Sequence, residues 1–212
     1  MVVNLTFSRQ LRTLGNQPRP TVSARYSEDP YGTEDLQREA FWRTLVAGRN
    51  GRGKLAPESY ATLLDIPWNA DSGRFYGTYG RAFQEIGTQN IPFRFAGRDF
   101  QDYFLQEVGG GRRQDADSNW YLDGDPFIRV VGVLWGRRLI TTKKGYIGIA
   151  DRNARQKDLL CILLGCDVPA ILRPPGDAYT WTGESYAHDL MEGQAMKGLA
   201  DGPDTSQDIV IL

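Results

Sequence analysis

Histidine and cysteine are scarce in this chain: its 212 residues include one histidine, His188, and two cysteines, Cys161 and Cys166. A zinc site would need all three with a carboxylate, but Cys161 lies inside the apolar run "CILLGC", where burying a charged cluster is costly and thiols are usually buried and inert. Two cysteines are too few to staple a chain of this length, which indicates a reducing compartment. The sequence therefore predicts no metal and no cofactor.

Long apolar runs and a charge imbalance are absent as well. No run approaches the ~18 to 20 residues of a membrane span, and "VVNLTFSRQLRT" after Met1 lacks the apolar core of a signal peptide, so we expect a cytoplasmic protein with no membrane partner. The net charge of -1 gives no bulk attraction to nucleic acid. Nucleic acid is therefore not the expected partner on charge alone, while small molecules, proteins and RNA loops stay open.

Hydrophobic residues make up 41% of the chain and support a packed core, while 24 glycines and 11 prolines predict short elements. Residues 1–32 are interpreted as an N-terminal arm that begins with a short strand or loop. Thr33 is the expected N-cap of a helix over "TEDLQREAFWRTLVAG" that ends at Gly48. Apolar spacing predicts further helices over residues 57–64, 80–86 and 98–108.

A linking helix is predicted from Asp125 onward, and its apolar stripe should be covered by the strands that follow. The segment "RRLITTKKGYIGIA" has the pattern of a hairpin turning at Lys144-Gly145, and "DLLCILLG", "VPAILR" and "AYTWTGESYAH" predict three more strands. In the last of these, Tyr179 and Trp181 alternate with threonines and are expected to point inward. The stripe of the linking helix consists of Phe127, Val130, Leu134 and Trp135.

These patterns predict an α+β fold in which a helical N-terminal part packs on a small antiparallel barrel-like β-sheet. The expected divisions are the arm at 1–32, the helical part at 33–136, the β part at 137–200, and a tail or edge strand at 201–212. Because the linking helix joins the two main parts through an apolar stripe, we expect one cooperative unit.

Two segments could support an enzyme. The Gly48–Lys54 loop has the spacing of a phosphate-binding loop up to its lysine, but Leu55 stands where a hydroxyl should hold magnesium, and a helix precedes it. Ser185, His188 and Asp189 could supply a nucleophile, a base and a carboxylate. Ser185 and His188 should lie on opposite faces of a strand, so we expect His188 instead to be buried and bonded to a backbone carbonyl.

Four segments, "FWRTLVAG", "GRRLITTKKGYIGIA", "DLLCILLGCDVPAILRPPG" and "YTWTGESYAHDLMEGQAM", follow one another in this order. Together, over about residues 35–197, they resemble the region that follows the HET domain in fungal heterokaryon-incompatibility proteins. The resemblance rests on a set of positions that we call the motif residues and interpret as structural. They are Arg138, Thr142, Gly145, Gly148, Asp158, Gly165, Pro169, Arg173, Gly183, Glu184, Tyr186, His188, Met191 and Gly193.

Three positions depart from that resemblance. Lys157 and Asp189 stand where the family commonly has glycine, and Gln194 stands where glutamate is frequent. A left-handed backbone costs lysine or aspartate more than glycine, which calls the local turn geometry into question.

The resemblance implies a non-enzymatic regulatory or recognition module of fungal non-self recognition and programmed cell death. A HET-domain protein is then the expected partner, since the segment before Asp35 is too short to be a HET domain itself. The alternatives are a small hydrolase or nucleotide-binding enzyme using the two segments above, and a stand-alone peptide- or nucleic-acid-binding barrel. Loop residues expected at an interface are Arg52, Arg112, Arg113 and Trp120.

Overall fold

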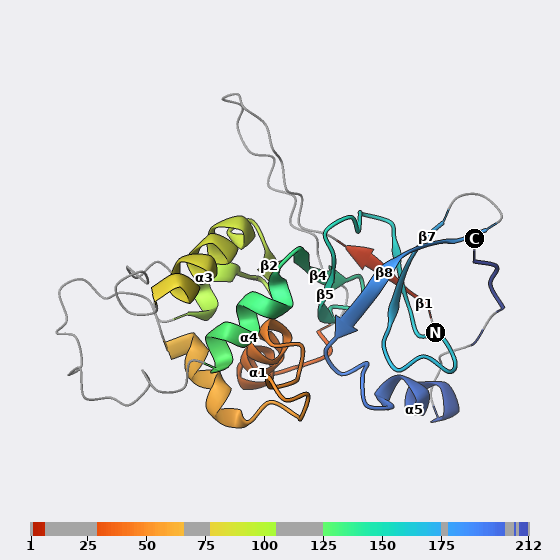
Figure 1. The fold of residues 1–212 in the computed structure, drawn as a ribbon. Helices are drawn as coiled ribbons and strands as arrows, with labels where there is room; N and C mark the ends of the chain where they lie inside the picture. Colours follow the sequence, from red (N-terminus) through yellow and green to blue (C-terminus); the bar gives the residue numbers. More distant parts are fainter. Residues whose placement is uncertain are drawn as a thin grey trace.

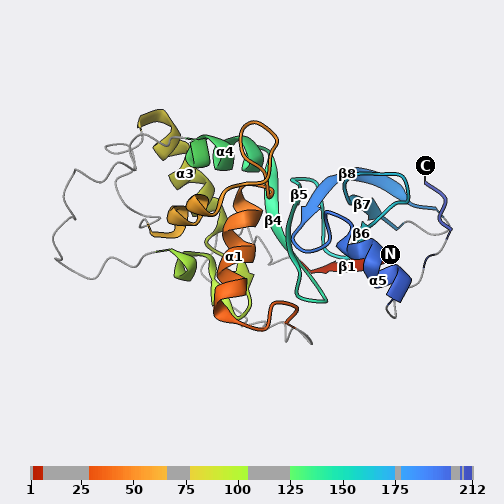
Figure 2. The same ribbon diagram turned by 90° about the horizontal axis from the view of Figure 1, so that it is seen from below.

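A closed β-barrel forms one side of the molecule, and a layer of helices covers part of its wall (Figure 1). The computed structural model describes residues 2–6, 29–65, 77–104, 125–174, 178–201, 206 and 208–211. Figure 2 shows the same two-part arrangement from below, with β4 and β5 between the helices and the rest of the barrel. The predicted α+β fold with a barrel-like sheet is therefore confirmed.

The barrel runs in the order β1-β4-β5-β8-β7-β6, and every neighbouring pair is antiparallel. The hairpin expected at Lys144-Gly145 joins β4 to β5, and Gly145 has the positive φ of +87° that such a turn favours in glycine. The strands are β1 (Val2–Thr6), β4 (Arg137–Thr142), β5 (Ile147–Asp151), β6 (Leu159–Cys161), β7 (Ala170–Arg173) and β8 (Thr180–Ala187).

Two strands close the barrel by changing partner along their length. In β1, Val2 pairs with Cys161 of β6, whereas Leu5 pairs with Thr142 of β4. The barrel thus takes a strand from the segment that the sequence analysis set apart as an N-terminal arm. β8 likewise pairs first with β7 and then with β5, and the register with β7 shifts between Ile171 and Leu172, the irregularity that bends a strand around a barrel.

Close approach of β5 to β8 explains one of the motif glycines. A Cβ on Gly148 would lie 2.3 Å from the backbone oxygen of Tyr186. That oxygen belongs to the main chain of a paired strand and cannot rotate away, so only glycine fits at this position.

The helical layer contains four of the five helices expected from the sequence. In α1 (Glu34–Leu45) the Thr33 side chain accepts a hydrogen bond from the Leu36 amide, which confirms the predicted N-cap. The 3-10 helix η1 (Glu58–Asp65) and α3 (Gly77–Asn90) overlap the predicted helices, and α4 (Asp125–Leu134) is the linking helix.

Where residues 98–108 were expected to be one helix, the structure is different. Arg98 and Asp99 form β3, which pairs with β2 (Arg94–Phe95), and a single helical turn, η2 (Phe100–Tyr103), follows. Asp99 and Asp102 form a capping box that starts this turn, and Phe100 and Tyr103 are buried. The apolar spacing thus predicted the buried positions correctly but not the helix. Gly97, at φ +78°, favours the tight turn between β2 and β3 instead.

One buried core joins the helices to the barrel wall. Leu139, Ile147 and Ile149 lie in the same cluster as Phe41 of α1 and Val130 of α4. Their strand neighbours face the other way and fill the barrel interior together with residues from β6, β7 and the segment after β8. This interior cluster consists of Ile140, Ala150, Ala154, Leu160, Ile171, Ala187, Leu190 and Ala195.

Two aromatic predictions were wrong. Phe127, Val130 and Leu134 are buried as expected, but Trp135 is 76% exposed. It follows the last residue of α4, beyond the stripe that faces the core. Trp181 is 43% exposed rather than inward, because small and aliphatic side chains already fill the barrel interior.

The end of the chain adds two features to the barrel. Residues 194–201 form α5 (Gln194–Asp201), a helix that the sequence analysis did not predict and that lies below the barrel in Figure 1. Ile211 makes an isolated parallel bridge with Tyr179, next to the start of β8, where the tail or edge strand was expected.

Because one core crosses the boundary between the parts, we predict that they unfold together. Ile149→Ala removes a fully buried side chain of β5 and should cost about 2–5 kcal/mol. Thermal unfolding followed by far-ultraviolet circular dichroism and by tryptophan fluorescence should show a single transition, lowered equally in both signals. Ile128→Ala, at a position 45% exposed on α4, is the matched control and should change little. Two separate transitions would contradict a single unit.

Candidate functional site at the junction of helices and barrel

The only histidine lies where β8 ends against the helical layer. Tyr186 and His188 are two residues apart and lie on one face, and the Tyr186 hydroxyl is 3.1 Å from Nδ1 of His188. The backbone amide of His188 donates to the Ile147 carbonyl (2.9 Å), which fixes the strand end. The expectation of a packed, bonded histidine is met, but the partner of its side chain is a tyrosine hydroxyl rather than a backbone carbonyl.

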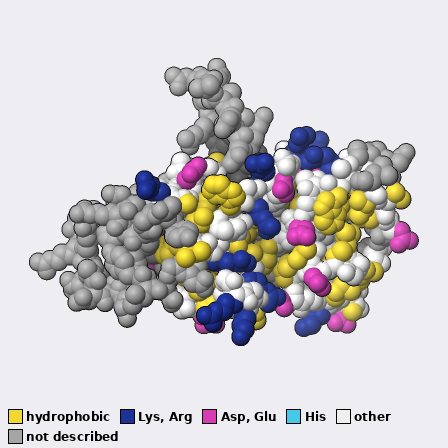
Figure 3. All heavy atoms as spheres, viewed as in Figure 1, with side chains coloured by type: hydrophobic (Ala, Val, Ile, Leu, Met, Phe, Trp, Pro, Cys, Tyr) yellow, Lys and Arg dark blue, Asp and Glu magenta, His cyan; other side chains and the backbone are white. Residues whose placement is uncertain are grey.

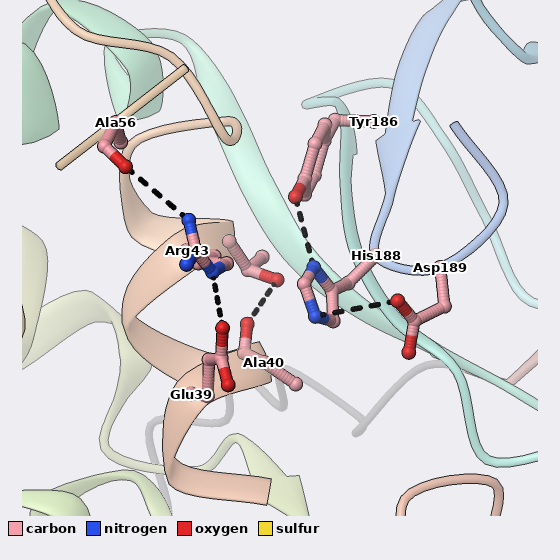
Figure 4. Close-up of polar contacts among 8 residues, drawn as sticks. Glu39, Ala40, Arg43, Ala56, Tyr186, His188 and Asp189 are labelled. Atoms are coloured by element: carbon pink, nitrogen blue, oxygen red, sulfur yellow. Dashed lines mark hydrogen bonds and ion pairs between the residues drawn. The ribbon is translucent and has the colours of Figure 1, made fainter. Parts of the chain in front are cut away.

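Residues from three other segments surround this ring. Tyr31, which precedes α1, lies with its ring centroid 5.8 Å from that of His188, and its hydroxyl accepts a hydrogen bond from the Ile147 amide. Glu39 and Arg43 of α1 are paired with each other, and Figure 4 shows them on the part of α1 that runs beside the end of β8. Asp189 places Oδ1 3.6 Å from Nε2 of the imidazole.

This environment favours the neutral imidazole. Burial lowers the pKa of His188, Asp189 opposes that shift, Arg43 lowers the pKa further and Glu39 again opposes. Burial also raises the pKa of the Tyr186 hydroxyl and of the Tyr31 hydroxyl. In the neutral tautomer that carries its proton on Nε2, the ring can accept a hydrogen bond from the Tyr186 hydroxyl at Nδ1, while Nε2 lies 3.6 Å from Oδ1 of Asp189.

The C-terminal end of α1 is shaped to receive Tyr186. Gly48 has φ +66°, its amide donates to the Arg43 carbonyl, and a Cβ there would lie 3.1 Å from the Tyr186 hydroxyl oxygen. Arg49, one residue later, forms an ion pair with Glu192, which follows β8. The junction therefore has an aromatic contact and a charged contact side by side.

Ser185 is not placed to act with His188. Its hydroxyl donates to the Ile149 carbonyl (2.9 Å), and its side chain is buried. The hydroxyl that contacts the imidazole is that of Tyr186, one residue further along the strand. The arrangement of Ser185, His188 and Asp189 therefore lacks the serine–imidazole contact of a catalytic triad.

Backbone amides of the Gly48–Lys54 loop are hydrogen-bonded within the loop itself. The Asn50 side-chain oxygen accepts from the amides of Arg52 and Lys54, and the Gly53 amide donates to the Asn50 carbonyl. A bridge between Arg49 and Leu55 closes the loop. A phosphate-binding loop must direct such amides at the phosphate, so this geometry does not favour nucleotide binding.

A buried carboxylate explains two more motif residues. Asp158 is 2% exposed and receives both Nε and Nη2 of Arg173 at 2.9 Å, as well as the Arg155 amide at 2.7 Å. Arg173 also donates to the Asn153 carbonyl. This two-pronged pair from β7 fixes the loop between β5 and β6, so the two residues act as a structural unit.

The remaining motif residues serve turns and strand ends. The Thr142 hydroxyl accepts from the Tyr146 amide in the β4–β5 turn, and the Pro169 carbonyl accepts from the Ser185 amide. Gly165 and Gly193 have positive φ values of +85° and +82°. Arg138, Gly183 and Met191 are half-buried, and Glu184 is exposed on β8.

Both departures from glycine adopt the backbone that glycine would favour. Lys157 has φ +77° and Asp189 has φ +60°. The turn geometry is thus kept, although a left-handed conformation costs an L-residue about 1–2 kcal/mol.

Other predicted residues are placed as follows. Arg52 is exposed on the Gly48–Lys54 loop, while Arg112, Arg113 and Trp120 lie outside the described residues. Cys161 is buried, and burial raises the pKa of its thiol to about 11, but Cys166 is exposed. Tyr31 and Arg43 were missed, because a tyrosine in a polar arm and an arginine on a helix give no signal of a shared site before the fold is known.

The described segments contain neither a cluster of metal-ligating side chains nor a membrane-spanning helix. No group of three or more histidine, cysteine or acidic side chains comes together there in a way that could hold a metal ion. Among the helices that the structure describes, none has the length and hydrophobicity needed to cross a bilayer.

Most of the barrel is similar to a known domain family. Residues 112–201 match the family described as the Het-6 beta-barrel domain, a domain found in fungal heterokaryon incompatibility proteins. The matched segment contains α4, β4 to β8 and α5 but not β1, and over these residues it confirms the resemblance to heterokaryon-incompatibility proteins. It associates the chain with heterokaryon incompatibility. No curated protein and no solved structure gives a significant match.

His188 should make the folding stability of the protein depend on pH. Because the pKa of His188 is lowered in the folded state, the unfolded chain takes up the proton first as pH falls. The stability from the neutral ring should thus be present above about pH 6.5 and be lost as pH falls from there through the folded pKa. Proton NMR should give one imidazole Cε1–H signal with a midpoint below about 6.5.

Tyr186→Phe tests whether the tyrosine hydroxyl adds to the effect of burial. Removing a hydroxyl that donates to Nδ1 should raise the pKa of His188, since the neutral ring loses a hydrogen bond, while burial keeps that pKa below its ordinary value. Ser185→Ala, on the other face of the strand, is the control and should leave the midpoint in place. A wild-type midpoint above the ordinary histidine value would contradict the burial argument.

The left-handed backbone at Lys157 should lower the stability of the protein. Lys157→Gly should stabilise the protein by up to about 1 kcal/mol, because relief of the φ +77° strain exceeds the added entropy of the unfolded chain. Gln156→Gly, at the preceding exposed residue, should instead destabilise it. Urea unfolding measures both changes, and equal losses in the two variants would show that the lysine is not strained.

Proposed function

We propose that the chain is a non-enzymatic recognition or regulatory module of fungal heterokaryon incompatibility that acts by binding a protein partner. The match to the Het-6 beta-barrel domain supports the association with incompatibility. The observation that carries the non-enzymatic part is the placement of His188 and Ser185, whose side chains are hydrogen-bonded within the fold rather than to each other.

The exposed tip of the Gly48–Lys54 loop is the contact surface we assign to the partner. Arg52 is exposed there, and Leu55, which closes the loop, is 62% exposed. Asn50 holds the loop backbone through two hydrogen bonds, so little ordering would be required on binding. An arginine and an aliphatic residue on a pre-ordered loop suit a protein surface, and a HET-domain protein is the first candidate.

Expression in a fungal cell tests this proposal. Induced alone, in a strain with no HET-domain protein, the chain should leave growth and the NAD pool unchanged, because the module has no reaction of its own. Induced together with a HET-domain protein that recognises it, the chain should arrest growth. Death or NAD loss in cells that express only this chain would overturn the proposal.

Loop variants test the contact surface in the same assay. The double variant Arg52→Glu, Leu55→Asp should raise the inducer concentration needed for growth arrest at least tenfold when it is expressed with the HET-domain protein. Its melting temperature should stay unchanged. Lys197→Glu, an exposed change on α5, is the control and should leave the effect intact. Retention of the full effect in the loop variant would place the contact elsewhere.

A further inference from the structure

Exposed cations gather at one end of the β4–β5 hairpin. Arg137 begins β4, and the loop between β5 and β6 contributes Arg152, Arg155 and Lys157. All four are exposed, and within the described part of the chain none of their side chains forms a hydrogen bond or an ion pair. Figure 3 shows Lys and Arg side chains gathered along the upper edge of the barrel.

The fold brings these four residues together. Arg137 is the register partner of Asp151, and the Arg152 amide donates to the Gly136 carbonyl, so the loop starts beside the base of β4. The Asp158–Arg173 pair and the buried Ala154 then hold the loop against β7. The cations are therefore carried by a fixed backbone, which reduces the entropy lost when they bind an anion.

Two exposed indoles belong to residues next to backbone that this loop contacts. Trp135 is 76% exposed and precedes Gly136, the residue bonded to the loop. Trp181 is 43% exposed and lies opposite Leu172, next to Arg173. Neither ring forms a stacked or edge-on aromatic contact among the described residues. We name Arg137, Arg152, Arg155, Lys157, Trp135 and Trp181 together the basic indole face.

We propose that the basic indole face binds single-stranded nucleic acid. Unpaired cations can neutralise successive phosphates, and open indole rings can stack on bases, which is the combination that single-strand recognition uses. An acidic peptide could pair with the cations equally well, but its side chains would give the two indole rings no flat surface to stack on. The net charge of -1 for the whole chain does not oppose this binding, because the positive charge is local.

The test uses the full chain and fluorescein-labelled dT20 and U20 in an anisotropy titration. Binding should weaken with salt, with a log–log slope near -3, since about four phosphate contacts each contribute roughly -0.7 on a single strand. Trp135→Ala and Trp181→Ala should each weaken binding about fivefold or more and leave the slope unchanged, because stacking is not ionic.

Two triple variants distinguish the effect of the three loop cations from the effect of losing three positive charges anywhere on the protein. Arg152→Gln, Arg155→Gln and Lys157→Gln together should reduce the slope by about two. The control removes the same charge elsewhere, through Lys143→Gln, Lys144→Gln and Lys197→Gln, and should leave binding within about twofold. Circular dichroism confirms that each variant is folded.

Three results would overturn the proposal. One is the absence of binding to either oligonucleotide at 20 mM salt, and another is an equal loss in the two triple variants. The third is displacement by poly-glutamate at the same charge concentration together with unchanged binding in both tryptophan variants, which would assign the face to an acidic polypeptide. None of these results depends on whether the chain takes part in incompatibility.

Discussion

The barrel wall that faces the helices is buried on both sides, and the rest of the molecule depends on this. Along β4 and β5, alternate residues such as Leu139 and Ile140 enter different clusters, one shared with α1 and α4 and one inside the barrel. A strand with two apolar faces cannot be exposed to water on either, so neither part of the molecule could present this wall alone. The helices therefore serve as the outer cover of the barrel.

The polar contacts of Tyr186, His188 and Tyr31 also result from the burial of this wall on both sides. Where β8 leaves the barrel, its Tyr186 and His188 side chains enter the helical layer and bring polar atoms with them. Each of these atoms meets a specific partner, and Tyr31 supplies a further hydroxyl for the Ile147 amide. The cluster orients the two layers more narrowly than apolar contact would, since hydrogen bonds require fixed angles.

Local chemistry was predictable from the sequence, and pairing at a distance was not. Thr33 as N-cap and the turn at Gly145 depend on neighbours in the chain, and the sequence pattern indicated both. The left-handed backbone at Lys157 and Asp189 did not follow from the sequence, because both residues depart from the glycine of the resemblance. The exposed positions of Trp135 and Trp181 depend on how much volume the core has left, which composition does not reveal. Within the site, Tyr186 and His188 were found through the resemblance, while Tyr31 and Arg43 reach them only through the fold.

The pairing of β1 has a consequence for the order in which the molecule can be assembled. Leu5 is held by Thr142, and Val2 by Cys161, so the first strand has no partner until β4 and β6 have left the ribosome. During synthesis the helical layer can form early from local contacts, while the barrel stays open along one seam. Closing that seam joins Val2 to Cys161, so this pairing closes a much longer stretch of chain than the hairpins do and costs more chain entropy. Throughout that interval β1 is an unpaired edge strand, the kind of segment that a chaperone or a second nascent chain would bind.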